Sequence, residues 1–391
     1  MLNKEVFLKY RFKRWYFHSL YWELINHPPE GFKIKYEKNS LTNESIHNLD
    51  SKSANPLLKE ILFHIKPIPY LMIQRIKQYE PKNCDLIYAS QHVLFNAKKP
   101  WVTDFEFASA LAAYGNISTV KNIIKKNLEH NQCKFILPWS NWAKETLLNS
   151  IDCKNLHEKI QVVNYTVQSK KFQKKSHDGI NILFVGSSNP MNVRNIQFKN
   201  LKEIILAFNE IYKKYDNVNL ILKSYLSPEL LTLASKNSHI KIINKFLDKE
   251  QLNEIYANAD IFVNPLHETL GISLLDAMSF ELPVITTNIY EIPEAITHMK
   301  NGLLIEPSPK MKYYTETKSP YDYSIKFVKG MNQVSEYMIE NIKKNMIMLI
   351  EDKSLRKKLG SEARNTIEKG DFSIEKRNEK LKKIFESSMK K

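Results

Sequence analysis

Short apolar runs rich in β-branched and aromatic residues alternate along this chain with segments that have the apolar period of a helix. This alternation is typical of parallel α/β sheets, in which a helix carries the chain from each strand to the next. In the first half, the pattern predicts helices at 57–78 and 118–130. The strands that it predicts there are residues 6–10, 85–89, 101–104, 134–137 and 160–164.

A polar, charged segment without periodicity, QSKKFQKKSHDG at 168–179, separates this half from the next. After it we predict strands at 180–185, 219–223, 240–243, 261–264, 284–287 and 302–305, and helices at 200–215, 249–257 and 272–280.

The restart predicts an α/β protein of two Rossmann-like domains, 1–167 and 180–371, joined by a linker at 168–179. Open parallel sheets bind ligands at the carboxyl ends of their strands, so we expect the two sheets to face each other across a cleft. Residues 372–391 form a predicted amphipathic helix that closes the chain, and we expect it to pack back on the first domain.

Most of the formal net charge of +16 lies in the first half, because residues 1–176 contain 27 Lys and Arg against 15 Asp and Glu. A one-sided positive field favours anionic partners such as phospholipid head groups, acidic glycans or nucleic acid. A generally lysine-rich composition would give the same excess without a function. In the segment 4–18, KEVFLKYRFKRWYFH, basic and aromatic residues interleave. This mixture is suited to an anionic membrane surface, but residues 6–10 are a predicted core strand, so only the residues after them can face lipid.

The cysteines Cys84, Cys133 and Cys153 show no metal-ligand spacing, and their odd number favours reduced thiols. No apolar run approaches the roughly 18–20 residues that span a bilayer, and the start lacks a signal-peptide pattern. We therefore expect a cytoplasmic protein that at most associates with the cytoplasmic face of a membrane.

The segment 262–294, FVNPLHETLGISLLDAMSFELPVITTNIYEIPE, carries the most informative chemistry. A buried strand ends near Asn264, a loop presents Glu268, and a helix begins after Gly271. The free amides at a helix start favour anions such as a diphosphate, and glycine permits a ligand to approach the backbone closely. Asp276 lies about one and a half turns into the same helix, since a turn takes about 3.6 residues.

A carboxylate accepts hydrogen bonds from paired sugar or ribose hydroxyls. Two carboxylates on either side of a helix N-terminus therefore suit a nucleotide sugar, in which a diphosphate joins two polyols. The alternative is that Glu268 and Asp276 only stabilise and solvate a helix start, where acidic residues are favoured anyway.

The segment resembles glycosyltransferase family 4, whose retaining enzymes have the GT-B fold and a Glu, seven residues, then a second Glu in a context similar to PSxxEGFGLPxLEAMAxGxPVIxT. The matching residues are Asn264, Pro265, Glu268, Gly271, LDAM at 275–278, PVIT at 283–286, Pro293, Glu294, Asn301 and Gly302. Further matches are ILFVG at 182–186, a Lys199-Asn200 pair at a helix start, and ANADIFVNP at 257–265. In the first half the similarity is looser, in DLIYASQ, FILPWSNWAKETL and KIQVVNYTV.

The resemblance implies that Glu268 holds the hydroxyls of the donor sugar and Asp276 those of the ribose. It also implies that Lys199, Arg194 and the amides that follow Glu268 stabilise the leaving diphosphate, so that the enzyme needs no metal and no other cofactor. The full set of expected donor-binding residues is Gly186, Lys199, His267, Glu268, Thr269, Leu270, Gly271, Ile272, Ser273 and Asp276.

The sequence departs from the family pattern at several positions. Asp276 stands where the family has its second Glu, and Ser187 follows the strand-end glycine where the family often has Arg. The glycine-rich loop that many members carry after the first strand is absent, so the acceptor cannot be inferred from the resemblance.

A second pair of carboxylates, Asp104 and Glu106, follows a predicted strand of the first domain. In the resemblance, Asp104 falls near a family histidine that faces the cleft, and a carboxylate there would position or deprotonate an acceptor hydroxyl. Two alternatives stay open: a structural turn, and a divalent-metal clamp of the Asp-x-Glu type.

We therefore hypothesise a retaining, metal-independent glycosyltransferase that moves a hexose from a nucleotide sugar to a lipid-linked or polymeric glycan acceptor. Its catalytic residues would be Glu268, Lys199, Arg194 and Asp104. One alternative is a non-catalytic module that binds glycans or nucleotides. The other is a basic nucleic-acid-binding protein, but we expect no nucleic-acid partner because no RRM, KH or helix-turn-helix pattern occurs.

Overall fold

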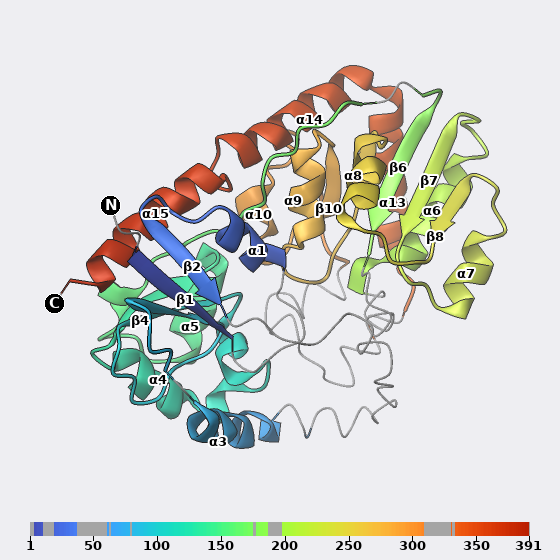
Figure 1. Cartoon of the computed structure of the whole chain (residues 1–391). Coiled ribbons are helices and arrows are strands. Elements are labelled where there is room, and N and C mark those ends of the chain that lie inside the picture. The colour runs from blue at the N-terminus through green and yellow to red at the C-terminus, as the bar shows by residue number, and fades with distance from the viewer. Residues whose placement is uncertain are drawn as a thin grey trace. The chain divides into compact units, whose positions relative to one another are not determined.

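The computed structural model of the chain describes residues 4–10, 19–36, 61, 64–78, 80–174, 177–186, 198–308, 330 and 333–390. The chain divides into two compact units, the first comprising Met1–Thr166 and Asp371–Lys391 and the second Val167–Gly370. Each unit contains a parallel β-sheet with helices packed against it (Figure 1). The prediction of an α/β protein with two Rossmann-like domains is therefore confirmed.

The sheet of the first unit has the strand order β2-β1-β3-β4-β5, and every neighbouring pair is parallel. Its strands are β1 (Lys4–Tyr10), β2 (Phe32–Tyr36), β3 (Leu86–Ser90), β4 (Trp101–Phe105) and β5 (Cys133–Pro138). The central strands β3 and β4 are buried along their whole length, as continuous apolar strands covered on both faces should be.

Two predictions for this sheet were wrong. The segment FKIKY forms β2, which pattern reading missed because lysines alternate with its apolar residues. Charged side chains are common on such edge strands, where they discourage pairing with another chain. Residues 160–164, predicted as a strand, form only an isolated bridge from Ile160 to Ile136 of β5.

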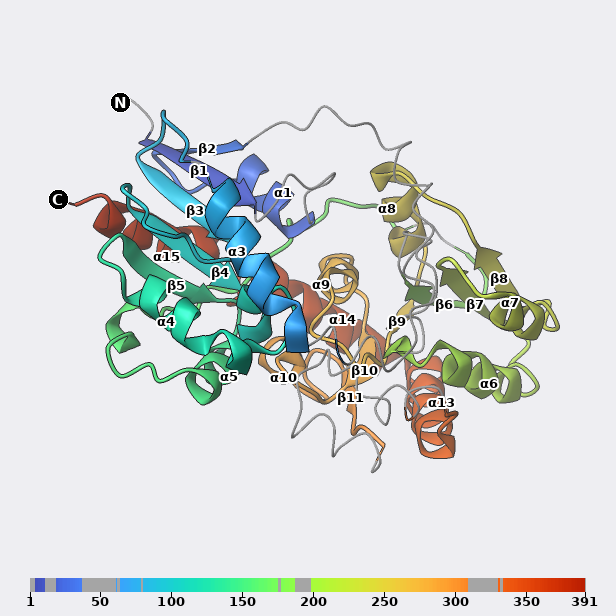
Figure 2. The same cartoon turned by 90° about the horizontal axis from the view of Figure 1, so that it is seen from below.

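The helices of the first unit cover both faces of its sheet, with α3, α4 and α5 on one face and α15 on the other (Figure 2). These helices are α1 (Ser19–Asn26), α3 (Pro67–Lys77), α4 (Lys121–Glu129), α5 (Asn141–Ser150) and α15 (Ile374–Ser388), and short 3-10 turns lie at Ala108–Ala112, Ile117–Thr119 and His157–Lys159. Arg377 of α15 is buried and donates to the carbonyl oxygens of Glu23 and His27 at 3.3 and 2.7 Å. This contact fixes the last helix of the chain to α1.

The sheet of the second unit has the strand order β11-β10-β9-β6-β7-β8, again with parallel pairs. Its strands are β6 (Ile180–Val185), β7 (Val218–Lys223), β8 (Ile240–Ile243), β9 (Ile261–Val263), β10 (Val284–Thr287) and β11 (Leu303–Ile305). Its helices are α6 (Leu201–Ile211), α7 (Pro228–Ala234), α8 (Lys249–Ala257), α9 (Ile272–Ser279), α10 (Ile292–Ala295), α13 (Glu336–Glu351) and α14 (Lys353–Glu368).

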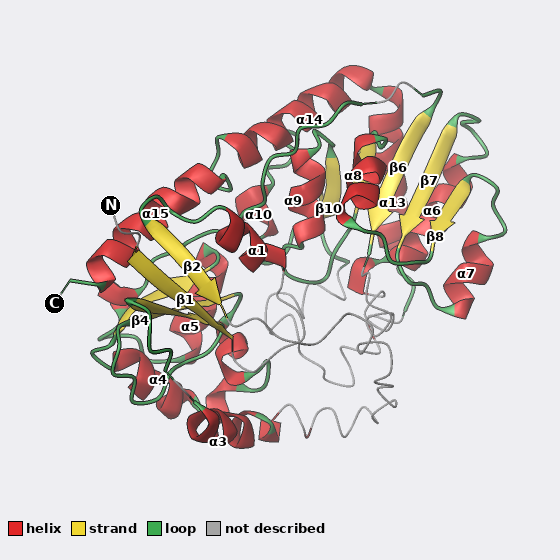
Figure 3. Ribbon diagram, viewed as in Figure 1, coloured by secondary structure: helices red, strands yellow, loops and turns green. Residues whose placement is uncertain are grey.

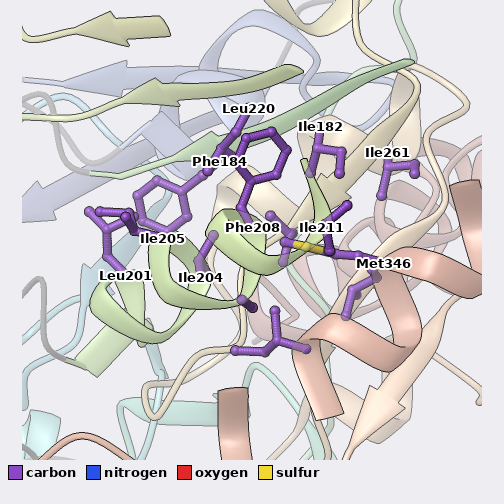
Figure 4. Packing of buried hydrophobic residues seen from close by; sticks show 14 of the residues in the cluster. Ile182, Phe184, Leu201, Ile204, Ile205, Phe208, Ile211, Leu220, Ile261 and Met346 are labelled. Carbon is purple, nitrogen blue, oxygen red and sulfur yellow. The ribbon is translucent and has the colours of Figure 1, made fainter. Parts of the chain in front are cut away.

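One apolar core joins α6 and α13 to this sheet, while α8 and α9 lie on its other face (Figure 3). The apolar side chains of α6 recur at helical spacing, and Phe208 packs beside Phe184 of β6 and Met346 of α13 (Figure 4). On the other face, α14 packs closely at Gly360, where a β-carbon would stand 2.2 Å from the carbonyl oxygen of Glu281. Only glycine allows this approach.

The strand order of the second sheet reverses beside β6. From β6 the chain steps outward to β7 and β8, and then returns to place β9 on the other side of β6. The connections that follow β6 and β9 therefore start next to each other and lead away in opposite directions. In open α/β sheets, such a switch point is where ligands bind.

The segment 4–18, predicted to dock on a membrane, is only partly described. Residues 11–18 lie outside the described residues, and residues 4–10 form β1, which pairs with β2 on one side and β3 on the other. A strand at 6–10 was predicted, and only the residues after it were expected to face lipid, so the docking prediction falls on residues outside the described ones and stays a prediction. Among the residues that the structure describes, no helix has the length and apolar character needed to cross a bilayer.

Candidate active site

The candidate site lies at the switch point of the second unit, where the loop Asn264–Gly271 leads from β9 into α9. Asn264 is fully buried at the start of this loop. Its side-chain amide donates to the carbonyl oxygen of Val185, the last residue of β6, at 3.4 Å, and to Ser273 Oγ in α9 at 3.3 Å. One amide therefore connects the two strand ends at the switch point with the helix start.

The start of α6 holds the same loop from the other side. The amide of His267 donates to the carbonyl oxygen of Phe198 at 2.6 Å, and Asn200 Nδ2 donates to the carbonyl oxygen of Pro265 at 2.7 Å. Asn200 has left-handed backbone angles, φ 47° and ψ 37°, which asparagine tolerates better than most residues. This conformation accounts for an asparagine directly before α6.

These contacts bring together two of the predicted site residues, Lys199 and Glu268. Lys199 Nζ lies 3.2 Å from Glu268 Oε2, and the two side chains are 15% and 18% exposed. Each charge is therefore matched by its neighbour while both groups keep some access to solvent. A ligand can reach the pair without having to desolvate two isolated charges.

The first turn of α9 lies next to this pair in the sequence. Gly271 is the N-cap residue of α9 and provides no side-chain hydrogen bond to the helix start. The helix-start amides and the positive end of the helix dipole therefore favour an anion here. Asp276 is partly exposed on the same helix. The pKa of Tyr256 is raised first by the burial of its own ring and second by the negative charge of Asp276.

The amide of Leu270 differs from the prediction. Leu270 was expected to contact the diphosphate, but its N–H donates to Oε1 of the buried Glu291 at 2.7 Å. The carboxylate of Glu291 thus holds the loop from the residue just before α10. Sequence reasoning missed Glu291 because the contact spans 21 residues and belongs to no motif.

Three other predicted donor-binding residues are buried or packed against neighbouring residues of the protein. His267 is buried, and burial lowers the pKa of its imidazole to about 4, so the ring is neutral at pH 7. Thr269 is also buried. At Gly186 a β-carbon would stand 2.3 Å from Ser224 Oγ, so packing inside the protein already requires glycine there. Arg194 lies outside the described residues.

A further cation, Lys223, was not predicted. It is the last residue of β7, pairs in register with Val185 and accepts a hydrogen bond at its carbonyl from the amide of Gly186 at 2.8 Å. Its side chain is fully buried, and burial lowers the pKa of its ammonium group. Its only signal in the sequence is a lysine at the end of an apolar strand.

With this geometry in place, comparison with known proteins identifies the region. Residues 179–316 match the family described as "Glycosyl transferases group 1". Over this stretch, the second unit is similar to the group 1 glycosyltransferases. The match covers the loop Asn264–Gly271, α9 and Lys199, and thus every described residue of the candidate donor site.

The curated relatives that the chain matches are distant. The chain is 25% identical over 262 residues to the capsular polysaccharide biosynthesis glycosyltransferase CapM of Staphylococcus aureus, which covers 64% of this chain and 58% of that protein. It is 32% identical over 112 residues to the N-acetyl-alpha-D-glucosaminyl L-malate synthase of Bacillus anthracis, which covers 28% of this chain and 29% of that protein. The chain therefore spans less than two thirds of the length of either relative.

Solved structures match over nearly the whole chain. A glycosyltransferase from Rickettsia africae ESF-5 has a TM-score of 0.62 at 15% identity and covers 99% of both chains. Anabaena Alr3699/HepE in complex with UDP and glucose has a TM-score of 0.58 at 13% identity, covering 98% of this chain and 100% of that one. These proteins are GT-B glycosyltransferases, so the predicted fold class is confirmed. Membership of family 4 in particular stays a prediction.

In the first unit, Asp104 is the centre of a buried hydrogen-bond network. The side chain is 1% exposed. The hydroxyl of Tyr21 donates to both carboxylate oxygens at 3.0 and 2.9 Å, and that of Tyr88 donates at 3.2 Å. The indole N–H of Trp139 donates to Asp104 Oδ2 at 2.9 Å, and the backbone N–H of Gln91 donates to Asp104 Oδ1 at 3.0 Å.

This network favours the structural alternative for Asp104, because donors already surround both of its oxygens. Burial raises the pKa of the Asp104 carboxyl to about 6, against the opposing effect of these hydrogen bonds. Glu106 accepts from the hydroxyl of Tyr114 at 3.1 Å and lies outside the network. Among the residues that the structure describes, no group of three or more His, Cys, Asp or Glu is arranged to hold a metal ion.

Replacing Asp104 by alanine should destabilise the first unit without weakening nucleotide binding. Each buried donor that loses its acceptor costs roughly 1–3 kcal/mol, so we expect the free energy of unfolding to fall by about 3–5 kcal/mol. Denaturant unfolding followed by tryptophan fluorescence and calorimetric titration of nucleotide measure the two effects. The control Glu106→Ala should lose less stability. A stable Asp104→Ala protein that binds nucleotide but has lost turnover would make Asp104 catalytic instead.

Asp104→Asn gives a pH readout of the same network. The folded pKa of about 6 lies above the unfolded value of about 3.9. Protonation of Asp104 therefore stabilises the folded wild type as the pH falls from about 6 towards 4, by up to about 3 kcal/mol. Asparagine cannot titrate, so the wild type should gain stability relative to the variant over this window, and a constant difference would contradict the assignment.

Replacing Glu291 by alanine should weaken nucleotide binding and lower stability, since the loop loses the acceptor for the Leu270 amide. The unsatisfied amide costs roughly 1–3 kcal/mol. Glu291→Gln keeps an oxygen acceptor and should retain most of the binding, while Glu306→Ala removes an exposed carboxylate as the control. Tighter nucleotide binding by Glu291→Ala would show the opposite, that Glu291 blocks an amide which the diphosphate uses.

Proposed function

We propose that the protein is a retaining glycosyltransferase that moves a hexose from a nucleoside-diphosphate sugar to a lipid-linked or polymeric glycan acceptor. The observation that carries the proposal is the Lys199–Glu268 pair, which lies beside the start of α9 at the sheet's switch point, inside a region that matches the group 1 family. The pair supports the proposal because it joins a cation to a carboxylate three residues before Gly271, the uncapped start of α9.

In the proposed complex, Glu268 accepts hydrogen bonds from hydroxyls of the donor sugar, and Asp276 accepts them from the ribose. Lys199 and the amides at the start of α9 contact the diphosphate. During transfer, the bond between the sugar C1 and the diphosphate oxygen breaks, and the acceptor oxygen bonds to C1. The proton of the acceptor hydroxyl passes to the departing diphosphate oxygen and from there to water, and the nucleoside diphosphate leaves with the negative charge that Lys199 and the helix start stabilise.

Proteins of similar fold support this choice of substrates. Anabaena Alr3699/HepE was solved with UDP and glucose, and a Staphylococcus aureus TarM mutant with UDP and alpha-GlcNAc-glycerol. The CapM relative is named for capsular polysaccharide biosynthesis. A thermal-shift screen of UDP-, GDP- and ADP-sugars would identify the base. Donor turnover with a glycan acceptor would then separate an enzyme from a module that only binds.

The two carboxylates of the site should contribute to different steps. Glu268→Gln should lower kcat more than nucleotide affinity, while Asp276→Asn should lower nucleotide affinity itself. A hydrogen bond to a charged group contributes roughly 1.5–3 kcal/mol, or about 10- to 150-fold in either quantity. Steady-state kinetics and nucleotide titration measure the split. Glu281→Gln, in the exposed turn after α9, is the control. Wild-type turnover by both variants would sink the assignment.

We also propose that the reaction needs no divalent metal, because Lys199 and the start of α9 supply positive potential for the diphosphate. Activity should persist in excess EDTA. Lys199→Ala should reduce turnover at least about tenfold, the effect of losing one charged contact. The control Lys202→Ala removes an exposed α6 lysine that pairs with Glu229 on the surface. Loss of activity in EDTA with recovery in Mn²⁺ would overturn the proposal.

A further inference from the structure

Tyr256, at the end of α8, has a buried hydroxyl that reaches the helix of the candidate donor site. The residue is 1% exposed, and its hydroxyl donates to the backbone carbonyl oxygen of Ser273 at 3.3 Å. Ser273 lies in the first turn of α9, on the same face of the second sheet as α8 (Figure 3). A buried tyrosine hydroxyl usually finds a partner. Here the partner belongs to the helix whose start we expect to bind the diphosphate.

Ser273 is held from two directions. Its Oγ accepts from the side-chain amide of Asn264 at 3.3 Å, while its carbonyl oxygen accepts from the tyrosine hydroxyl. The amide of Leu274 donates to the N-cap carbonyl of α9 at 3.0 Å. The amides of Ile272 and Ser273 come before this bond and have no partner inside the helix. The two contacts therefore fix one of the residues whose amides an anion would use.

An aromatic stack fixes the ring of Tyr256. The ring is nearly parallel to that of Phe280, with an interplanar angle of 10° and centroids 5.4 Å apart, and Phe262 of β9 packs against it at 5.9 Å. Phe280 is the C-cap residue of α9 and is 2% exposed. Because the ring is held between the C-terminal end of α9 and a central strand, its hydroxyl has little freedom to move relative to the first turn.

The C-terminal end of α9 is also fixed by contacts that do not involve this hydroxyl. Arg364 of α14 donates to the carbonyl oxygen of Ser279 at 3.0 Å, which is favourable because a helix end carries partial negative charge. Phe172 packs against Phe280 with centroids 5.2 Å apart. Removing the hydroxyl of Tyr256 should therefore loosen the first turn of α9 and leave the end of the helix in place.

Asp276, the expected ribose ligand, acts on the same tyrosine. Burial of the ring and then the negative charge of Asp276 raise the pKa of the Tyr256 hydroxyl well above its usual range. The hydroxyl thus keeps its proton at neutral and mildly alkaline pH and stays a donor to Ser273. One side chain is in this way linked to both parts of the expected nucleotide site, the helix-start amides and the carboxylate.

We propose that Tyr256 is a positioning residue for the donor nucleotide. Its hydroxyl holds the first turn of α9, so that the helix-start amides face the diphosphate and Asp276 faces the ribose. Groups that are ordered before a ligand arrives need not be ordered at binding, which improves affinity. Tyr256 is buried and acts through Ser273 and Asp276. The inference rests on the proposed function for the identity of the ligand.

Tyr256→Phe tests this role, because it keeps the aromatic stack and removes the hydroxyl alone. We expect the Kd for the nucleoside diphosphate that the wild type binds best among UDP, GDP and ADP to rise about three- to tenfold, the effect of one net hydrogen bond. The donor KM should rise with it, and kcat should fall by a smaller factor, since Tyr256 is remote from the reacting atoms. Titration and kinetics are run well below the unfolding temperature of every variant.

The matched control is Tyr215→Phe, which removes a hydroxyl that donates to Glu351 at 2.5 Å. Tyr215 lies before the start of β7, at the edge of the second sheet opposite to the site. Its loss should leave the Kd unchanged. Hydrogen exchange of the nucleotide-free proteins should show faster exchange of amides 272–276 in Tyr256→Phe alone.

A double variant shows whether the hydroxyl acts through the site. If Tyr256 orients Asp276, its hydroxyl contributes less once Asp276→Asn has removed the charge. The rise in Kd for Tyr256→Phe with Asp276→Asn should then be smaller than the product of the two single rises. Tyr215→Phe combined with Asp276→Asn should give the rise of Asp276→Asn alone.

The outcomes separate this inference from the proposed function. A wild type that binds none of the nucleotides and turns over no donor would overturn both. A wild type that binds nucleotide while Tyr256→Phe keeps its Kd, or whose double variant shows the full product, would overturn the role of Tyr256 alone. An equal loss of affinity in Tyr215→Phe would also overturn it, since the effect would then be a general one.

Discussion

The candidate site depends on the buried side-chain amide of Asn264. In the second sheet, the connections after β6 and β9 lead away from each other, and a side-chain link joins their origins in addition to the pairing of the two strands. The side chain of Asn264 makes this link by donating to the end of β6 and to the start of α9, while the backbone carbonyl of the same residue accepts from Thr286 Oγ1 at 2.9 Å. Because these groups are buried, losing one partner would leave polar atoms unsatisfied, so the loop is held in one conformation.

This anchoring explains how the loop can present charge without becoming unstable. Glu268 and Lys199 come from segments on opposite sides of the switch point, and each neutralises the other until a ligand arrives. Glu291 fixes the following amide from a third segment. The loop is therefore held by α6, β6 and the approach to α10 together, and its charged tip remains accessible. A rigid support with a polar tip is the arrangement that positions groups for a charged substrate.

The sequence predicted the strands of the second sheet well, because strands buried on both faces form continuous apolar runs. It also indicated the loop and helix around Glu268, since local chemistry and a local motif coincide there. The sequence did not predict the role of a residue where that role depends on partners distant in the chain. Asp104 follows a strand as a ligand-binding carboxylate would, but its donors include Tyr21, 83 residues away. The lysines of β2 concealed an edge strand for a related reason, since an edge position tolerates charge that a central strand would not.

Asp104 and α3 are opposite departures from the rule that apolar residues lie inside and polar residues outside. Around Asp104, the interior accepts a carboxylate because Tyr, Trp and backbone donors satisfy it. On α3, the interior takes two glutamines, again because backbone groups satisfy them, and the isoleucines of the same helix are left in solvent. A buried polar group whose hydrogen bonds are satisfied costs little free energy, so the contacts of Asp104 within the protein are enough to explain its burial. Apolar area in water has no such compensation among the described residues, so the exposed isoleucines of α3 are the less easily explained of the two departures.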